Sequence, residues 1–241
     1  MNRLRSAIGR CAILGAAGAT VAACGTAPAS SNSLSQLRRA VSGATASGTA
    51  RFVESIRTGT QTSTLSGDLS ATAAYETLSD NGIELQVELT GDVIYLRGTA
   101  SSVESALALS AAVAQQNARQ WISVQPSDQP YAGILQTLSL PALLSAFTPV
   151  SSRSTTHKVV KLKGVSRLAF SGTPSLGTSP GVGVSVTLFI PVSGSPDPIG
   201  GTSVFVQGEE RTSEAIVFSR WGTAVSVTAP TGARTYSSLA G

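Results

Sequence analysis

The clearest pattern in the chain is a strict alternation of apolar and polar residues, which recurs in two separate regions. Residues 83–90 read IELQVELT, and residues 182–191 read VGVSVTLFIP. Alternation with a period of two predicts strands that have one dry face and one wet face, which is typical of antiparallel sheets.

Weaker versions of the same pattern, divided by turn residues, predict further strands in both regions. Asn81-Gly82 and Gly91-Asp92 are two-residue hairpin turns, because Gly and Asn accept the positive φ angles that such turns need. In the first region we expect strands at 50–58, 64–78 (one strand or a pair), 83–90 and 92–97. In the second region we expect them at 156–163, 165–172, 182–191, 202–208, 214–221 and 224–229.

Helical periodicity interrupts the strands at the start and in the middle of the chain. A short amphipathic helix is predicted from Leu34 to Ala44. A longer helix is predicted over 101–118, where Ser101 or Ser102 with Glu104 resembles a capping box. A short strand at 121–124 follows. Two short helices at 131–138 and 141–147 complete the middle region.

The order of helix, strands, helices and strands predicts an α+β fold built on one large antiparallel sheet. About ten or eleven strands would curl, because twisted sheets of that size do not stay flat. We expect a half-barrel whose concave face is covered by the mid-chain helices, with a cavity between them that is either packed shut or open to an apolar ligand. The candidate cavity-lining residues are Leu85, Val87, Leu89, Leu107, Leu135, Leu138, Leu143, Leu144, Phe147, Val184, Val186 and Leu188.

The first residues predict export and a lipid anchor. Residues 1–10 hold three arginines and no acid, and residues 11–23 hold no charge, as in a secretory signal. Val21-Ala22-Ala23-Cys24 resembles the bacterial lipobox, which implies cleavage before Cys24 and a diacylglyceryl group on its sulfur. The alternative is an ordinary signal with a chance cysteine. We therefore expect a signal peptide at 1–23, a flexible tether at 24–33 and a single domain at 34–241.

Composition excludes several classes of function once the signal is removed. The remaining 218 residues (241 − 23) carry 14 basic and 13 acidic side chains, and no basic run is interleaved with aromatics, so a nucleic-acid partner is not expected. With Cys24 acylated and Cys11 discarded, no thiol remains for a disulfide or a metal site. We expect no catalytic site, no metal and no cofactor.

Several short motifs resemble a group of actinobacterial lipoproteins of the LppX–LprG type, which share the LolA/LolB half-barrel. They are AIVFSRWGTAVSVTAP at 215–230, VIYLRG at 93–98, QWISV at 120–124 and the segment 162–172. The resemblance implies a LolA-like lipoprotein that holds or ferries a lipid or another acylated molecule beneath its curved sheet.

The remaining polar candidates have simple explanations. His157 is expected to be solvated at the start of a strand. Lys158, Lys161 and Lys163 form either a solvated outer face or a contact for anionic lipid headgroups.

Three functional hypotheses follow. The leading one is a membrane-anchored carrier or chaperone for an apolar ligand, located on the outer face of the bacterial cytoplasmic membrane. The alternative is a non-enzymatic envelope interaction, sensor or assembly domain with a closed core. An enzyme with Ser–Lys chemistry is the third.

Overall fold

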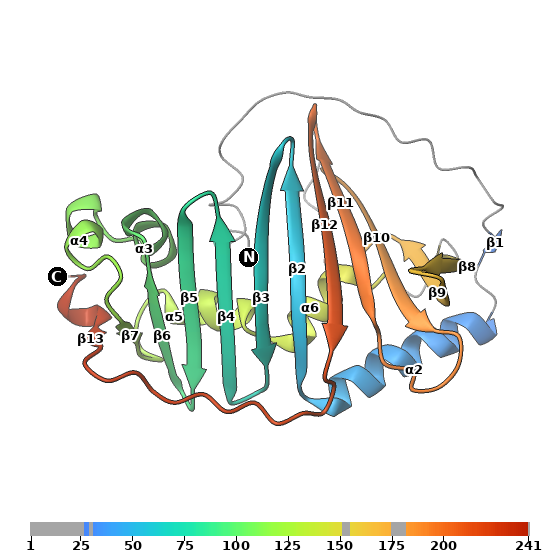
Figure 1. The fold of residues 1–241 in the computed structure, drawn as a ribbon, viewed down its shortest axis with the longest axis horizontal. Helices are drawn as coiled ribbons and strands as arrows, with labels where there is room; N and C mark the ends of the chain where they lie inside the picture. Colours follow the sequence, from blue (N-terminus) through green and yellow to red (C-terminus); the bar gives the residue numbers. More distant parts are fainter. Residues whose placement is uncertain (1–26, 29–30, 151–154, 175–181, 241) are drawn as a thin grey trace.

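The computed structural model describes residues 27–28, 31–150, 155–174 and 182–240. Within them one sheet of thirteen strands runs in the order β1-β8-β9-β10-β11-β12-β2-β3-β4-β5-β6-β7-β13 (Figure 1). All neighbours are antiparallel except β13 and β7, which are parallel. The sheet is curled and does not close, so the predicted half-barrel is confirmed.

The strands follow the predicted alternation closely. The first half of the chain contributes β1 (Ala27–Pro28), β2 (Ala50–Thr58), β3 (Gln61–Leu69), β4 (Ala73–Asp80), β5 (Ile83–Thr90), β6 (Val93–Gly98) and β7 (Ile122–Val124). The second half contributes β8 (Thr156–Leu162), β9 (Val165–Gly172), β10 (Val182–Pro191), β11 (Gly200–Gln207), β12 (Glu210–Ser219) and β13 (Arg234–Thr235). The region 64–78 is thus a pair of strands, and β12 pairs with β2 to join the two halves.

Five α-helices accompany the sheet in the described part of the chain. They are α2 (Ser31–Ser47), α3 (Ala100–Leu107), α4 (Ala111–Gln116), α5 (Tyr131–Thr137) and α6 (Leu140–Phe147), and a 3₁₀ turn, η1, spans Tyr236–Ser238. The cap of α6 is Ser139, whose hydroxyl accepts a hydrogen bond from the Ala142 amide. Pro141 lies in the first turn, where a backbone N–H would have no partner within the helix, so its missing N–H costs no hydrogen bond.

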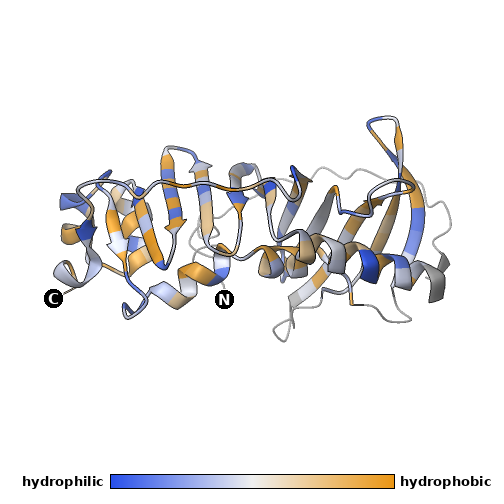
Figure 2. Cartoon of the chain, turned by 90° about the horizontal axis from the view of Figure 1, so that it is seen from below, coloured by the Kyte–Doolittle hydropathy of each residue, from blue (hydrophilic) through white to orange (hydrophobic). Residues whose placement is uncertain are grey.

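The helices lie on the concave side of the sheet, and the chain after β12 crosses the other side (Figures 1 and 2). The helix α6 contacts β10, β11 and α2, and α3 contacts β5 and β6. In Figure 1, α5 and α6 cross behind the lower part of the strands, so the upper ends of β2, β3 and β12 reach beyond them. No helix among the described residues has both the length and the apolar character needed to cross a membrane.

The helix predicted over 101–118 is in fact two helices, and its predicted cap is wrong. Ala108 adopts a left-handed conformation, and Ser110 then caps α4 by accepting from the Val113 amide. The residue before α3 is Thr99, and Ser102 donates instead to the carbonyl of Glu84 on β5. A tertiary hydrogen bond has therefore replaced the local capping box.

The predicted strand at 224–229 is also wrong. Residues 220–230 form an extended segment, here called the strap, that crosses the outer face without joining the sheet. The reason is that β2 already occupies the edge of β12 that this segment would need.

Regular secondary structure begins before residue 34, where the domain was predicted to start. Within the segment 24–33 that was expected to be a flexible tether, Ala27 and Pro28 pair with His157 and Thr156 of β8, and α2 begins at Ser31. Contacts with the sheet therefore start close to the proposed acylation site.

Candidate functional site

The predicted cavity-lining residues lie on the inner side of the sheet or on the helices that cover it. Those from β5, α3 and α6 belong to one apolar cluster that also includes Leu138, directly after α5, and Leu188 of β10. Most are almost fully buried, whereas Leu135 and Val184 are half-buried. In this lower region the helices pack directly on the sheet, because Gly201 of β11 leaves room for the ring of Phe147 on α6.

A second row of inner-face residues lies next to this cluster, toward the upper strand ends of Figure 1, and it contains polar as well as apolar side chains. Strand register pairs five of its members one after another from β10 to β3, and the sixth, on β4, lies one position beyond the end of the β3–β4 ladder; all six are buried. We call it the upper row, and it consists of Val186, Ser203, Glu214, Ile56, Ser63 and Asp80. Neither of its two apolar members belongs to the continuous apolar cluster. The inner face thus changes from apolar packing below to mixed polar and apolar chemistry above.

The two acids of the upper row differ in their surroundings. Ser203 donates a hydrogen bond of 2.6 Å to Glu214 Oε2 from the neighbouring strand. Asp80 is 7% exposed, and its Oδ1 is buried with no hydrogen-bond partner. Since desolvating a carboxylate oxygen costs free energy unless a donor replaces water, Asp80 provides an acceptor that a ligand with a donor group could satisfy.

Two more acids occupy inner-face positions below the upper row. Glu54 of β2 and Glu76 of β4 are both buried on the side of the sheet that faces the helices. Sequence reasoning missed these acids as site residues. The available signal was a carboxylate at a position where the alternation calls for an apolar residue, as in Phe52-Val53-Glu54-Ser55-Ile56.

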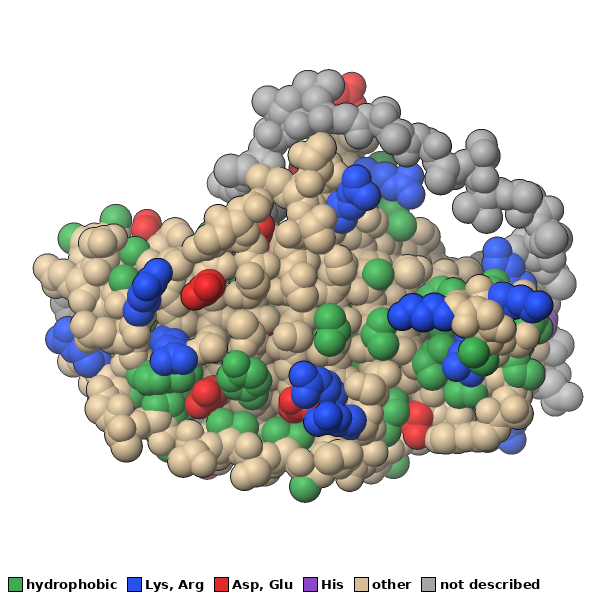
Figure 3. All heavy atoms as spheres, viewed as in Figure 1, with side chains coloured by type: hydrophobic (Ala, Val, Ile, Leu, Met, Phe, Trp, Pro, Cys, Tyr) green, Lys and Arg blue, Asp and Glu red, His purple; other side chains and the backbone are tan. Residues whose placement is uncertain are grey.

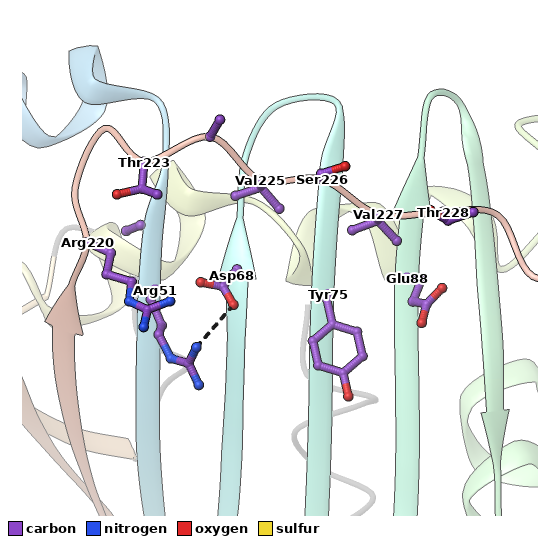
Figure 4. Close-up of a pocket in the computed structure, with 12 residues that line it drawn as sticks. Arg51, Asp68, Tyr75, Glu88, Arg220, Thr223, Val225, Ser226, Val227 and Thr228 are labelled. Atoms are coloured by element: carbon purple, nitrogen blue, oxygen red, sulfur yellow. Dashed lines mark ion pairs between the residues drawn. The ribbon is translucent and has the colours of Figure 1, made fainter.

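The outer face carries a separate groove of about 520 Å³ between the strap and the sheet (Figure 4). Its floor is one row of outward-facing side chains from β2 to β5, namely Arg51, Asp68, Tyr75 and Glu88. Its wall is the strap from Thr223 to Thr228. Arg51 and Asp68 form an ion pair of 3.7 Å, so the groove is polar and is not suited to an acyl chain.

One acid in this groove, Glu88, has a shifted pKa. Burial raises the pKa of Glu88, and the positive charge of Arg97 on β6 partly offsets the effect. A raised pKa means that the folded protein holds the proton of Glu88 more tightly than the unfolded chain does.

The expectation that His157 is solvated needs correction, and the reason is its packing. The imidazole is half-buried, stacks on Phe170 with a centroid distance of 6.1 Å, and lies 3.2 Å from Ser33 Oγ on α2. The ring therefore ties the start of α2 to β8. Within the described residues, His, Cys, Asp and Glu side chains form no group of three that could hold a metal ion.

Comparison with known proteins identifies the architecture. No family model matches the chain, and no curated protein matches it by sequence. Among solved structures, LprF from Mycobacterium bovis is similar, with a TM-score of 0.53 and 15% identity over 86% of this chain and 100% of that one. The structure of MucB in complex with MucA(peri) matches more weakly, with a TM-score of 0.32 and 12% identity over 83% of this chain and 59% of that one.

The fold is therefore that of a LolA-like half-barrel. In particular, it is similar to LprF, a protein of the LppX–LprG type, so the resemblance suggested by the short motifs is confirmed at the level of the fold.

Proposed function

We propose that the protein is an envelope lipoprotein, anchored through Cys24, that binds an apolar ligand such as a lipid or an acylated molecule on the inner face of its curled sheet. The observation that carries the proposal is the upper row, which is buried on the inner face but lies outside the apolar cluster. Ligand sites of this kind combine apolar walls with a few polar groups that fix orientation.

The same row indicates the chemistry of the polar end of the ligand. Asp80 and Glu214 are acceptors when ionised, and Asp80 Oδ1 has no partner within the described protein. A ligand with hydroxyl or amine donors would satisfy them, whereas a free fatty acid would bring a third carboxylate into the same region. We therefore expect a preference for ligands with a donor-rich polar end.

Native mass spectrometry tests the proposal. The soluble mature chain with Cys24→Ala, produced in a bacterial host, is expected to carry a co-purifying lipid or to take up an added one. The variant Val184→Trp places a bulky ring on the inner face of β10, next to the upper row, and is expected to lose the ligand.

Ser185→Trp is the matched control, because Ser185 is the next residue on β10 and faces outward, where it is exposed. This variant is expected to retain the ligand. A clean apo mass for the parent protein, together with no uptake of any added lipid, would contradict the proposal.

The packing of the lower region favours a second candidate, an envelope interaction or assembly domain with a closed core. There, α6 rests against β11 so closely that a Cβ on Gly201 would lie 2.9 Å from Phe147 Cβ. Equal lack of ligand in the parent, Val184→Trp and Ser185→Trp would support this second function.

A further inference from the structure

The chain that leads to Cys24 is bound to one end of the sheet. Ala27 and Pro28 pair with His157 and Thr156 on β8, and Ser33 on α2 contacts the His157 ring. Only Gly25 and Thr26 separate Cys24 from β1. Three residue steps span at most about 11 Å, so an acyl group on Cys24 cannot lie far from β8.

The hairpin of β8 and β9 has the surface chemistry of a membrane contact. Lys161 and Lys163 are exposed at its tip, and they stand beside Val159 and Val165, which are 61% and 48% exposed. Lys163 and Gly164 form the turn, with φ angles of 48° and 80°. Figure 3 shows basic and apolar side chains together at the end of the molecule where Figure 1 places β8 and β9.

Acidic residues are absent from this end over long stretches of the sequence. No Asp or Glu occurs between Asp128 and Asp197, and none occurs from Gly25 to Val53. Taken together, the elements β1, α2, β8, β9 and β10 therefore contain basic residues and no acidic ones. The mature chain as a whole is nearly neutral, so positive charge is concentrated beside the anchor.

We infer that the β8–β9 hairpin is the face that rests on an anionic bilayer and orients the half-barrel there. This inference rests on the anchor at Cys24 in the proposed function. A span of at most about 11 Å between Cys24 and β1 keeps β8 close to the lipid headgroups, and attraction between lysines and anionic lipids is strongest within about one Debye length of that surface. Exposed valines beside the lysines add apolar contact at the interface.

The test is co-sedimentation of the soluble Cys24→Ala mature chain with phosphatidylcholine vesicles, with and without phosphatidylglycerol. Binding is expected only with phosphatidylglycerol and is expected to weaken at high salt. The double variant Lys161→Gln and Lys163→Gln should bind about 30-fold more weakly, as expected for two lysines close to an anionic surface.

The matched control is Arg57→Gln with Arg211→Gln, which removes the same charge from exposed positions at the far tips of β2 and β12. It should bind like the parent. Equal weakening in both doubles, no preference for phosphatidylglycerol, or binding to an acidic peptide but not to vesicles would overturn the inference.

Vesicle binding tests this inference, and uptake of a lipid ligand separately tests the proposed function. Uptake of a lipid ligand by the lysine double variant should equal that of the parent, since both lysines lie on the hairpin tip, away from the upper row. Loss of vesicle binding with intact uptake supports the inference, whereas absence of uptake in every variant contradicts the proposed function alone.

Discussion

Gly201 shows how a single residue positions a covering helix. It lies on the inner face of β11, where an added Cβ would meet Phe147 Cβ and the Thr187 carbonyl at 2.9 Å. Neither contact can be relieved by the free end of a flexible side chain. The absence of a side chain at this position is therefore what lets α6 rest on the sheet.

Gly201→Ala is expected to lower the free energy of unfolding by about 1–3 kcal/mol, because overpacking forces backbone shifts. Urea denaturation measures the effect. Gly183→Ala on β10 is the control, since its nearest neighbour would lie 3.8 Å from the new Cβ. That control should be neutral or slightly stabilising. Equal destabilisation by both variants would contradict the role given to Gly201.

Glu88 links the stability of the fold to pH. Its pKa in the folded protein is raised by burial beneath the strap, so the native state binds more protons than the unfolded state as Glu88 titrates. The contribution of Glu88 to stability is then most favourable below the unfolded pKa of about 4.3, and it declines as the pH rises through the folded pKa.

Glu88→Gln is therefore expected to stabilise the protein at neutral pH and to have little effect at pH values below the unfolded pKa. Thermal unfolding of parent and variant across the acidic to neutral range checks this. Glu84→Gln serves as a control, because Glu84 lies on the same face of β5 and is exposed. A stability difference that does not change with pH would contradict the assignment.

At the scale of elements, the strap connects two parts of the sheet that are distant in the strand order. Trp221 lies at its start, where it donates from Nε1 to the Pro198 carbonyl at 2.9 Å and packs on Phe218. Beyond its other end, Arg234 donates to Asn117 Oδ1 at 2.8 Å and pairs with Ile122 on β7. Specific contacts thus fix the chain on both sides of the strap.

Trp221→Phe is expected to keep the ring contact with Phe218 and to lose the hydrogen bond, at a cost of about 1 kcal/mol. Urea denaturation measures the loss, and faster hydrogen exchange in the strap should accompany it. Trp121→Phe is a useful comparison, because Arg97 can still lie over the smaller ring. An unchanged exchange rate in the strap of Trp221→Phe would show that another contact holds it.

At the scale of the whole molecule, the proposed anchor at Cys24 decides where the half-barrel works. A diacylglyceryl group supplies two acyl chains, which meets the requirement for stable membrane anchoring. Cys11 lies within the segment expected to be removed with the signal, so the two cysteines should have different consequences when they are replaced.

Cys24→Ala is expected to move the protein from the membrane fraction to the soluble envelope fraction and to abolish incorporation of a labelled fatty acid. Cys11→Ala should leave both unchanged. Fractionation and metabolic labelling in a bacterial host check the two variants side by side. Retained label in Cys24→Ala would contradict lipidation at this residue.

Local sequence was sufficient to predict most elements of the fold. The alternation in residues 83–90 and 182–191 reports which face each strand buries, because side chains in a strand point to opposite sides in turn. The turn residues Asn81-Gly82 and Gly91-Asp92 indicated the hairpin connections for the same reason of local geometry. The break at Ala108 escaped prediction because alanine carries no signal for a left-handed conformation.

Burial of apolar side chains on the inner face was predicted, whereas the upper row was not, apart from Val186. Leu85, Leu143 and Leu188 were identifiable because they lie on the apolar side of an alternating or helical pattern, which is the side that an element buries. The upper row could not be foreseen, since it exists only through register across six strands. Glu214 and Asp80 are 134 residues apart in the chain (214 − 80), and no local pattern relates them.

The local amino-acid sequence was enough to predict the strands, their buried faces and an anchor at Cys24, because each of these depends on residues that are close together in the chain. The tertiary structure was needed to establish that β12 pairs with β2, that the strap crosses the outer face and that β1 rests on β8. The physical reason is that a strand can pair with any free strand edge, and which pairing forms depends on how the whole sheet buries its apolar face.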